Sequence, residues 1–357
     1  MKENSLMNKV RVLFSLILFT MLTYPATAQT SSDDVNKLST IAWSTDGTRI
    51  AGVYDDSSIA IWAVENTNDP ILTIDADIAD DVMWTPDSEY IITQGRHLQN
   101  ENHLQMSVTK WRATTGELVE TLFSFEMDTS LEFNWYGYVI FPAIAIDRTA
   151  TNIAYSFRSS NTYLSGVPTV LFAGPDSWNN YNYMMQWSPG STHIAVANGT
   201  SDVYNILIFE TDSQNPIFVI NQSMQYFVTD MVWDSTGKYL ATSSITITGG
   251  EGWSSIGIYE IEQPTDEIPL YIYSADRWWY EVNPDAASIA WHPIDTILAV
   301  ATEFAIEFYS PLSDDAIYTI PAASIQDLAW SPDGTQIAGV LLDGTIQIWD
   351  YESSPSS

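Results

Sequence analysis

The sequence has no cysteine, so it can form neither a disulfide nor a lipidated N-terminal cysteine. Basic residues are scarce as well: 12 Lys and Arg stand against 45 Asp and Glu, which gives a formal net charge of −33. A surface this acidic repels phosphate backbones and anionic lipid, so we expect no nucleic-acid partner. Without disulfides, stability must come from burial, and 357 residues with 45% hydrophobic content are enough for a large core.

Long apolar runs are also missing, except near the N-terminus. There Lys2, Lys9 and Arg11 precede an apolar run over 12–23, which Ala26-Thr27-Ala28 follow. A basic start, a short apolar run and small residues are typical of a secretory signal peptide, and the run is too short to span a bilayer. We therefore predict a signal peptide over residues 1–28, no membrane insertion after its cleavage, and a secreted, periplasmic or extracellular location.

A short segment recurs along the rest of the chain. The C-terminal copy reads AWSPDGTQIAGVLLDGTIQIWD (Ala329 to Asp350), and IAWSTDGTRIAGVYDDSSIAIWA (Ile41 to Ala63) matches it nearly position for position. Ile146 stands in one copy where the others carry tryptophan. Five further copies of the first half begin at Val82, Ile144, Met185, Met231 and Ile289. Self-similarity at a period of roughly 40 residues indicates seven structural repeats.

Each repeat predicts a small antiparallel sheet. A strand ends in Trp, a turn rich in Ser, Pro, Asp and Gly follows, and a β-branched strand, a second turn and a strand ending in an aromatic residue complete the unit. A fourth strand follows most repeats, and several begin with proline, which suits an outer edge strand. A sheet this small is marginal alone, so the repeats must pack together. We predict an all-β fold, a seven-bladed β-propeller of four-stranded antiparallel blades over residues 29–350, followed by a short polar tail over 351–357.

Four-stranded units at this spacing, with a terminal Ile348-Trp349-Asp350, resemble WD40 repeats. The resemblance covers about residues 38–350 and implies a β-propeller with a central channel. No Gly-His pair occurs, and only Trp349-Asp350 keeps the Trp-Asp pair, so we expect the hydrogen-bond network of the family's His and Asp to be mostly absent. Periplasmic propellers with SPDG repeats fit the same residues and have the same architecture.

The last repeat lacks a fourth strand after Asp350. By analogy with WD40 propellers, we expect residues from Gln29 to Val35 to add that strand and to close the ring. Closure would remove exposed sheet edges, which otherwise invite aggregation.

Insertions lengthen the second, fourth and fifth repeats between their second and third strands, at 94–105, 198–204 and 245–255. Others precede the first strand of the next repeat, at 124–140 and 274–288, and a further one lies at 173–183. In an antiparallel sheet the second-to-third and fourth-to-first connections emerge at the same end. We therefore predict that long loops crowd one face of the disc, here called the insertion face, while short first turns line the opposite face. Long loops on a rigid scaffold are where binding usually occurs.

Nine of the 14 tryptophans end first or third strands, where packing between blades accounts for them. The other five fall in the insertions, together with several tyrosines. Aromatic side chains in loops either fold over a blade or meet a ligand, and both interpretations stay open. The candidate contact residues on the insertion face are these aromatics and three of the few arginines: Arg96, Trp135, Tyr136, Arg158, Trp178, Trp253, Arg277, Trp278, Trp279 and Tyr280.

Motifs for catalysis and metal binding are missing: there is no GxSxG, no zinc pattern and no complete calcium loop. The acidic stretch over 75–81 fits either a solvated turn or a calcium site. We predict no cofactor and no enzymatic activity, and we interpret the protein as a secreted, non-catalytic scaffold for a protein or peptide partner. The alternative is a carbohydrate-binding or glycoside-hydrolysing propeller using the same face, because paired carboxylates and stacking aromatics suit glycans.

Overall fold

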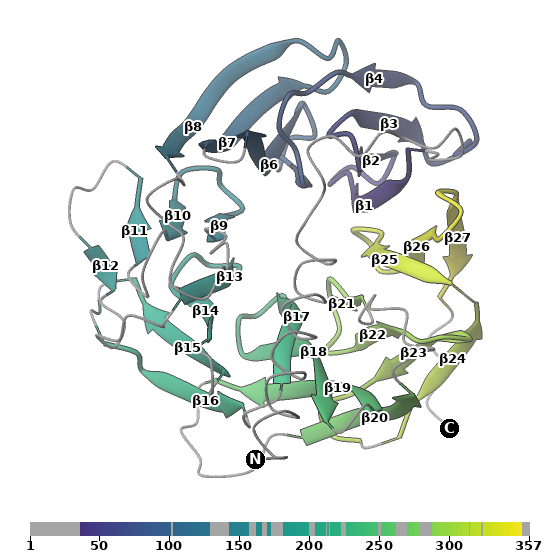
Figure 1. Cartoon of the computed structure of the whole chain (residues 1–357). Coiled ribbons are helices and arrows are strands. Elements are labelled where there is room, and N and C mark those ends of the chain that lie inside the picture. Colours follow the sequence, from purple (N-terminus) through teal and green to yellow (C-terminus); the bar gives the residue numbers. More distant parts are fainter. Residues whose placement is uncertain are drawn as a thin grey trace, which may run out of the picture.

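Seven small antiparallel sheets lie radially around a central axis (Figure 1). The seven-bladed propeller predicted from the sequence is therefore confirmed. The computed structural model describes residues 36–100, 103–128, 143–156, 162–165, 170–172, 181–199, 204–211, 213, 215–222, 226–248, 251–261, 270–278, 288–313, 315–322 and 324–351. Within these ranges there is no helix, and so none that could cross a membrane.

The first four blades follow one another along the chain, and each strand pairs antiparallel with the one before it. Blade 1 contains β1 (Leu38–Trp43), β2 (Arg49–Tyr54), β3 (Ile59–Ala63) and β4 (Leu72–Ile74). Blade 2 contains β5 (Asp81–Trp84), β6 (Tyr90–Asn100), β7 (His103–Arg112) and β8 (Leu118–Asp128). Blade 3 contains β9 (Ala143–Ile146), β10 (Ile153–Ser156), β11 (Thr162–Leu164) and β12 (Val170–Phe172). Blade 4 contains β13 (Tyr181–Trp187), β14 (His193–Gly199), β15 (Tyr204–Glu210) and β16 (Phe218–Gln222).

The remaining three blades return the chain to the first one (Figure 1). Blade 5 contains β17 (Tyr226–Trp233), β18 (Tyr239–Thr248), β19 (Glu251–Glu260) and β20 (Leu270–Trp278). Blade 6 contains β21 (Ile289–Trp291), β22 (Leu298–Ala301), β23 (Ala305–Tyr309) and β24 (Tyr318–Pro321). Blade 7 contains β25 (Ile325–Trp330), β26 (Gln336–Leu341) and β27 (Ile346–Asp350).

In blades 2, 4, 5, 6 and 7 the first-strand tryptophan bonds to the blade before it. Trp84 donates its indole N–H to the carbonyl of Ala42 in blade 1, at 3.0 Å. Four other tryptophans make the equivalent bond: Trp187, Trp233, Trp291 and Trp330. In each case the acceptor is the carbonyl of the next-to-last residue in the first strand of the preceding blade. These indoles are also buried in the apolar clusters between blades, which confirms their predicted packing role.

A buried polar side chain directly after each first strand holds the short first turn. In blade 1, Ser44 Oγ accepts the N–H of Arg49 at 2.9 Å and donates to Asp46 Oδ1 at 2.7 Å. Three residues after Ser44, Gly47 has φ of 75°, in the left-handed region that glycine adopts without strain. Such local bonds fix the turn within each repeat, so the turn needs little help from the rest of the fold. The corresponding buried side chains are Thr85, Asp147, Ser188, Asp234, His292 and Ser331.

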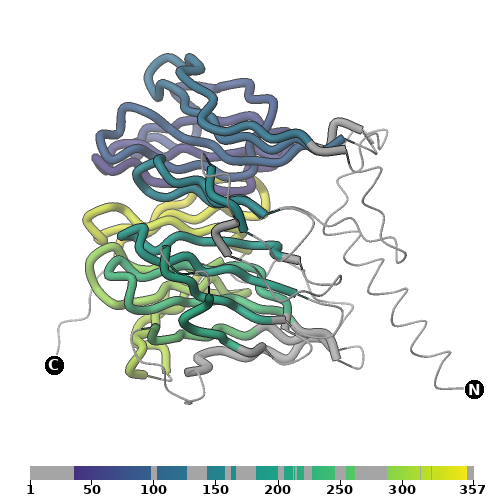
Figure 2. Tube along the Cα trace, turned by 90° about the vertical axis from the view of Figure 1, so that its left-hand side faces the viewer, coloured from purple at the N-terminus to yellow at the C-terminus, as the bar shows by residue number. Residues whose placement is uncertain are grey.

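Two of the predicted insertion loops are strands instead. Residues 94–100 belong to β6, and 245–248 and 251–255 belong to β18 and β19. β8 and β20 are lengthened to match, so blades 2 and 5 each carry a long three-stranded ladder. We call β6–β8 the blade 2 ladder and β18–β20 the blade 5 ladder. Backbone pairing satisfies the N–H and C=O groups that a long loop would leave to solvent. In the edge-on view the blade 2 ladder reaches past the other blades toward the insertion face (Figure 2).

The last blade has only three strands among the described residues, as the sequence predicts. Residues 29–35, expected to supply the fourth strand, lie outside the described ranges, and so does the predicted signal peptide over 1–28. Blade 7 nevertheless contacts blade 1 directly: Asp327 Oδ2 accepts the N–H of Ile41 at 2.8 Å, and Thr67 Oγ1 donates to the carbonyl of Ile346 at 3.4 Å. These bonds hold the first and last blades together.

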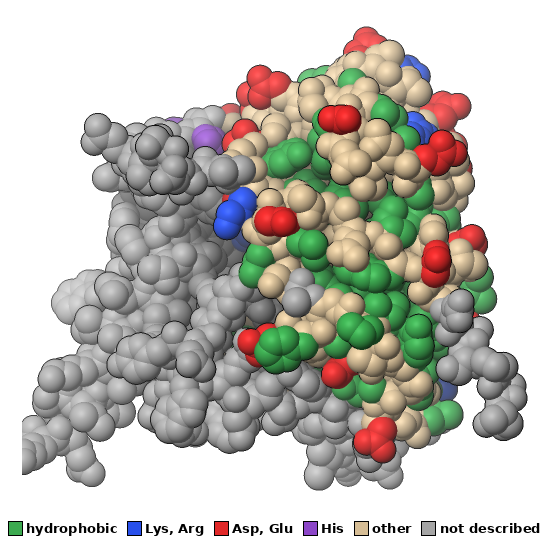
Figure 3. Space-filling model, turned by 90° about the vertical axis from the view of Figure 1, so that its right-hand side faces the viewer, with side chains coloured by type: hydrophobic (Ala, Val, Ile, Leu, Met, Phe, Trp, Pro, Cys, Tyr) green, Lys and Arg blue, Asp and Glu red, His purple; other side chains and the backbone are tan. Residues whose placement is uncertain are grey.

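The outer rim mixes exposed apolar side chains with acidic ones (Figure 3). Ile71, Val119, Ile217 and Ile317, which are 41–60% exposed, lie in or beside fourth strands. Single exposed apolar residues are common on soluble proteins, and the surrounding acidic charge favours solubility.

Candidate partner-binding site on the insertion face

One position of the repeat lies on the first, innermost strand of each blade, toward the insertion-face end (Figure 1). It lies three residues before the last residue of each first strand, near the point where the chain enters the blade from the insertion face. Three of its seven occupants are aspartates, contributed by blades 2, 5 and 7. We call these three the axial aspartates. The seven occupants are Thr40, Asp81, Ala143, Met184, Asp230, Ser288 and Asp327.

Hydrogen bonds to the backbone orient the axial aspartates. Asp327 Oδ2 accepts the N–H of Ile41 and the hydroxyl of Thr40, both in the next blade, at 2.8 and 2.9 Å. Asp230 Oδ2 likewise accepts the N–H of Ile289 in the next blade at 3.2 Å, and its Oδ1 accepts the N–H of Met231 at 2.7 Å. Two of these carboxylates therefore join consecutive blades at the axis.

Asp81 is held within its own blade. Its Oδ1 accepts the N–H of Val82 at 2.8 Å, and its Oδ2 accepts the amide Nε2 of Gln94 at 3.1 Å. Unlike the other two, this carboxylate makes no bond to the next blade in the described part of the chain.

The axial aspartates repel one another, because they share a crowded part of the protein. Burial raises the pKa of Asp81 to about 6 and that of Asp230 to about 7, and in both cases the charge of Asp327 adds to the effect. Burial also raises the pKa of Asp327, against the opposing effect of its hydrogen bonds. Solvent still reaches all three, since Asp81 is exposed and the other two are half-buried, and this screens part of the repulsion. The axis thus carries negative charge that an approaching cation would relieve.

Arg96 lies beside this group on the blade 2 ladder. Its backbone N–H donates to Asp80 Oδ2 at 2.8 Å, and its side-chain Nε lies 3.5 Å from the same oxygen. Gly95 allows this approach, because a Cβ there would stand 2.8 Å from Asp80 N and from Ala79 Cα. Arg96, predicted as a contact residue, is therefore one-third exposed and paired with an acid.

The other candidate contact residues are less completely placed. Trp253, Arg277 and Trp278 lie at the end of the blade 5 ladder, where Glu251 pairs with Trp278 and Gly252 with Arg277. The structure thus brings these three positions to one end of one blade. Six candidates lie outside the described residues: Trp135, Tyr136, Arg158, Trp178, Trp279 and Tyr280.

Exposed and buried side chains alternate along most of the acidic stretch over 75–81, as they do in an extended segment. Asp75, Asp77 and Asp80 are exposed, while Ala76, Ile78 and Ala79 are buried. The acids therefore point to solvent and the apolar residues point into the blade. Within the described residues no group of three or more acidic or histidine side chains could hold a metal ion.

Sequence reasoning missed Asp230 and Asp327. A signal for them was present: both stand three residues before a first-strand tryptophan, in the same column of the repeat as Asp81. Aligning the repeats on tryptophan would have shown that the three carboxylates share one end of the axis.

The fold is a seven-bladed β-propeller, and its repeated tryptophan turns resemble WD40 repeats. The family model described as "WD domain, G-beta repeat" matches residues 315–350. Among curated proteins the chain is similar to Protein HIR1 of Yarrowia lipolytica, at 21% identity over 348 residues, and to Protein HIR1 of Candida albicans, at 24% over 325 residues. These alignments cover 87% and 86% of this chain but 29% of each relative, so the chain spans less than a third of their length.

Two solved structures share the fold at 12% identity. One is titled Kuenenia stuttgartiensis hydrazine synthase, with a TM-score of 0.62 over 92% of this chain and 99% of that one. The other is the Cps50 (Swd1) β-propeller domain of Myceliophteria thermophila, with a TM-score of 0.59 over 90% of this chain and 100% of that one. Identity this low supports the propeller architecture alone.

The comparisons correct one prediction and agree with another. The predicted secreted, periplasmic or extracellular location is contradicted, because the curated relatives that the chain matches are Protein HIR1 of two yeasts. The apolar N-terminal run that suggested export is a short, local signal, whereas the similarity extends over most of the chain. The prediction that the chain is not an enzyme agrees with the relatives, since WD40 propellers such as HIR1 and Swd1 are non-catalytic scaffolds.

Proposed function

We propose that this propeller is a scaffold that binds a protein or peptide partner through its insertion face, and that the partner presents basic side chains to the axial aspartates. The observation that carries the proposal is the convergence of the two long ladders and the three axial carboxylates on one face. WD40 propellers in general bind protein partners, which supports the wider part of it.

The negative charge of the axial aspartates favours a partner with basic side chains. Each of the axial aspartates has a raised pKa, so ionising them at neutral pH costs free energy in the unbound protein. A lysine or arginine placed among them would remove that cost and lower their pKa values. Trp253, Arg277 and Trp278 on the blade 5 ladder, and Arg96 on the blade 2 ladder, remain the proposed contact residues at the edge of this site.

Photocrosslinking from two positions of blade 2 tests the face. A photoreactive residue at His97, which is exposed on the ladder, should capture a partner from a lysate of the source organism. The same residue at Val119, on the rim of the same blade, is the matched control. We expect a protein that is captured from position 97, is not captured from position 119, and is lost or reduced when Asp81→Asn is added.

Capture from position 119 alone, or capture from both positions that Asp81→Asn leaves unchanged, would contradict the proposal. The carbohydrate alternative is tested with the same pair of proteins on a glycan array. Glycan binding that Asp81→Asn removes, with no protein captured, would favour that alternative.

A further inference from the structure

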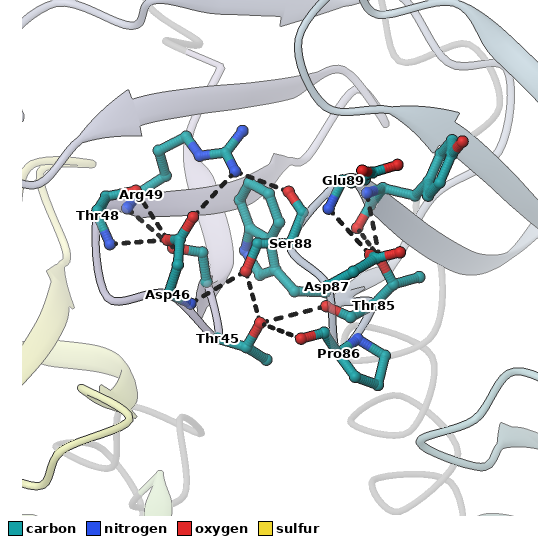
Figure 4. Close-up of polar contacts among 12 residues, drawn as sticks. Thr45, Asp46, Thr48, Arg49, Thr85, Pro86, Asp87, Ser88 and Glu89 are labelled. Carbon is teal, nitrogen blue, oxygen red and sulfur yellow. Dashed lines mark hydrogen bonds and ion pairs between the residues drawn. The ribbon is translucent and has the colours of Figure 1, made fainter.

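Arg49 occupies a well-defined seat between the first turns of blades 1 and 2 (Figure 4). The short first turns lie on the face opposite the insertion face. The guanidinium of Arg49 lies over the ring of Trp84, with Cζ 4.7 Å from the ring centroid. Its Nη2 donates to the carbonyl of Ser88 at 2.7 Å and pairs with Asp46 Oδ2 at 3.4 Å. The seat thus has three parts: an indole face, a turn carbonyl and a carboxylate.

The same position covers the next blade's tryptophan at other junctions. Arg49 stands six residues after Trp43, and the residue at this place in blades 4 and 5 is aromatic. His193 lies 6.3 Å from Trp233, and Tyr239 lies 6.3 Å from Trp291, measured between ring centroids. At these three junctions a side chain from one blade therefore covers the first-strand tryptophan of the next.

The junction between blades 7 and 1 departs from this pattern. The corresponding residue of blade 7 is Gln336, and its amide Nε2 turns away to donate to Asp350 Oδ1 at 2.8 Å. A cavity of about 360 Å³ lies at this junction, and we call it the blade 7–blade 1 pocket. Trp43, Gly47, Asp333 and Gln336 are among the residues that line it.

Three of these residues correspond to the three parts of the Arg49 seat, and the fourth corresponds to Arg49. Trp43 stands where Trp84 does, Gly47 where Ser88 does, and Asp333 where Asp46 does, counted from the first-strand tryptophan of each blade. Gln336 stands in the place of the arginine itself. The pocket is thus a guanidinium seat whose own arginine is replaced by a shorter, uncharged side chain that bonds elsewhere.

Trp43 gives independent evidence that this junction is less complete than the others. It is 8% exposed, yet its Nε1 has no hydrogen-bond partner among the described residues, whereas five other first-strand tryptophans donate to the preceding blade. Within the described part of the chain, Trp43 therefore lacks both the indole hydrogen bond and an arginine or aromatic side chain at the covering position.

We propose that the blade 7–blade 1 pocket binds the guanidinium group of an arginine side chain from a protein partner, stacked on Trp43, bonded to the carbonyl of Gly47 and paired with Asp333. This site lies on the face of the short first turns and goes beyond the proposed function of the insertion face. It gives the scaffold a second, separate contact point.

The chemistry of the pocket suits arginine better than other cations. Hydrogen bonds from the hydroxyl of Ser331 and the N–H of Thr335 lower the pKa of Asp333, so its carboxylate is charged at neutral pH. A planar guanidinium can stack on an indole while its edge donates to two acceptors, which an ammonium cannot do. The excess of acids over bases in the whole chain also attracts cationic partners.

Titration with N-acetyl-arginine amide tests the pocket in the full-length protein labelled with isotopic tryptophan. The indole resonance of Trp43, assigned by its loss in Trp43→Phe, should shift with a Kd on the order of 10 mM. N-acetyl-citrulline amide, which has the same shape without the charge, should bind about tenfold more weakly.

Three variants complete the test. Gln336→Arg should fill the seat from within, abolish the shift caused by the probe and raise Tm by about 1–2 °C. Asp333→Asn should weaken binding about fivefold. Asp87→Asn, at the same turn position of blade 2, is the matched control and should leave the affinity unchanged. Equal binding of arginine and citrulline probes, unchanged binding in Gln336→Arg, or no shift up to about 100 mM probe would overturn the proposal.

Discussion

Asp230 makes the stability of the protein depend on pH near neutrality. Its pKa is about 7 in the folded protein, against an ordinary value of 3.8. Because the folded state holds this proton more tightly, the contribution of Asp230 to stability is fully present at low pH and is lost as pH rises from about 4 through 7. The full shift corresponds to about 4 kcal/mol, and solvent around this half-buried carboxylate reduces the expected loss to about 2 kcal/mol.

Asp230→Asn isolates this effect from the general repulsion of an acidic chain. The variant loses one acceptor for the N–H groups of Met231 and Ile289, so we expect it to be about 1–2 kcal/mol less stable than the wild type at pH 5. At pH 8 the wild type bears the cost of the charge, and the difference should shrink by about 1 kcal/mol relative to pH 5, because part of the loss has already occurred at pH 5.

Guanidinium chloride unfolding at pH 5, 6, 7 and 8 measures this difference directly. Asp343→Asn is the control. Asp343 lies in the exposed turn between β26 and β27, and hydrogen bonds from Thr345 lower its pKa. The difference in unfolding free energy between this variant and the wild type should therefore stay flat above pH 5. A difference between Asp230→Asn and wild type that is also flat from pH 5 to 8 would refute the reasoning.

Two further predictions concern the turns and the closure of the ring. Ala150 has φ of 58°, so Ala150→Gly should relieve strain and stabilise the fold by about 0.5–1 kcal/mol. Gly237 has φ of 75°, so Gly237→Ala should destabilise the fold by about 1 kcal/mol. Changes in Tm of the same sign in the two variants would contradict this reasoning. Removing residues 29–35 should lower Tm by several degrees if they cover the edge of β27, and an unchanged Tm would show that they do not.

The fold could be predicted from sequence because each blade is specified locally. The tryptophan, the polar side chain after it and the residue with positive φ recur in a short window, and each has a local physical reason to be there. Insertion length, in contrast, does not distinguish a loop from a longer hairpin. The β-branched residues at 245–248 were the evidence for strand, and β18 and β19 do pair there.

The candidate site was harder to predict because its members are distant in sequence. Asp81, Asp230 and Asp327 come from three blades that are not adjacent in the ring, and they meet only because the ring brings equivalent positions to one axis. The blade 7–blade 1 pocket was hidden for the same reason, since it is defined by comparing Gln336 with Arg49 in two different repeats.

The axial aspartates are not needed simply to join the blades. Ser288 occupies the same column, and its uncharged Oγ accepts the N–H of Leu328 in the next blade at 3.1 Å while donating to Asp327 Oδ1 at 3.0 Å. A hydroxyl therefore suffices for the bond that Asp230 and Asp327 make. The carboxylates add mutual repulsion, which raises the free energy of the folded state at neutral pH. These carboxylates lower stability at positions where serine could make the same bond. A role in binding explains their presence, and a basic partner at the insertion face would supply that role.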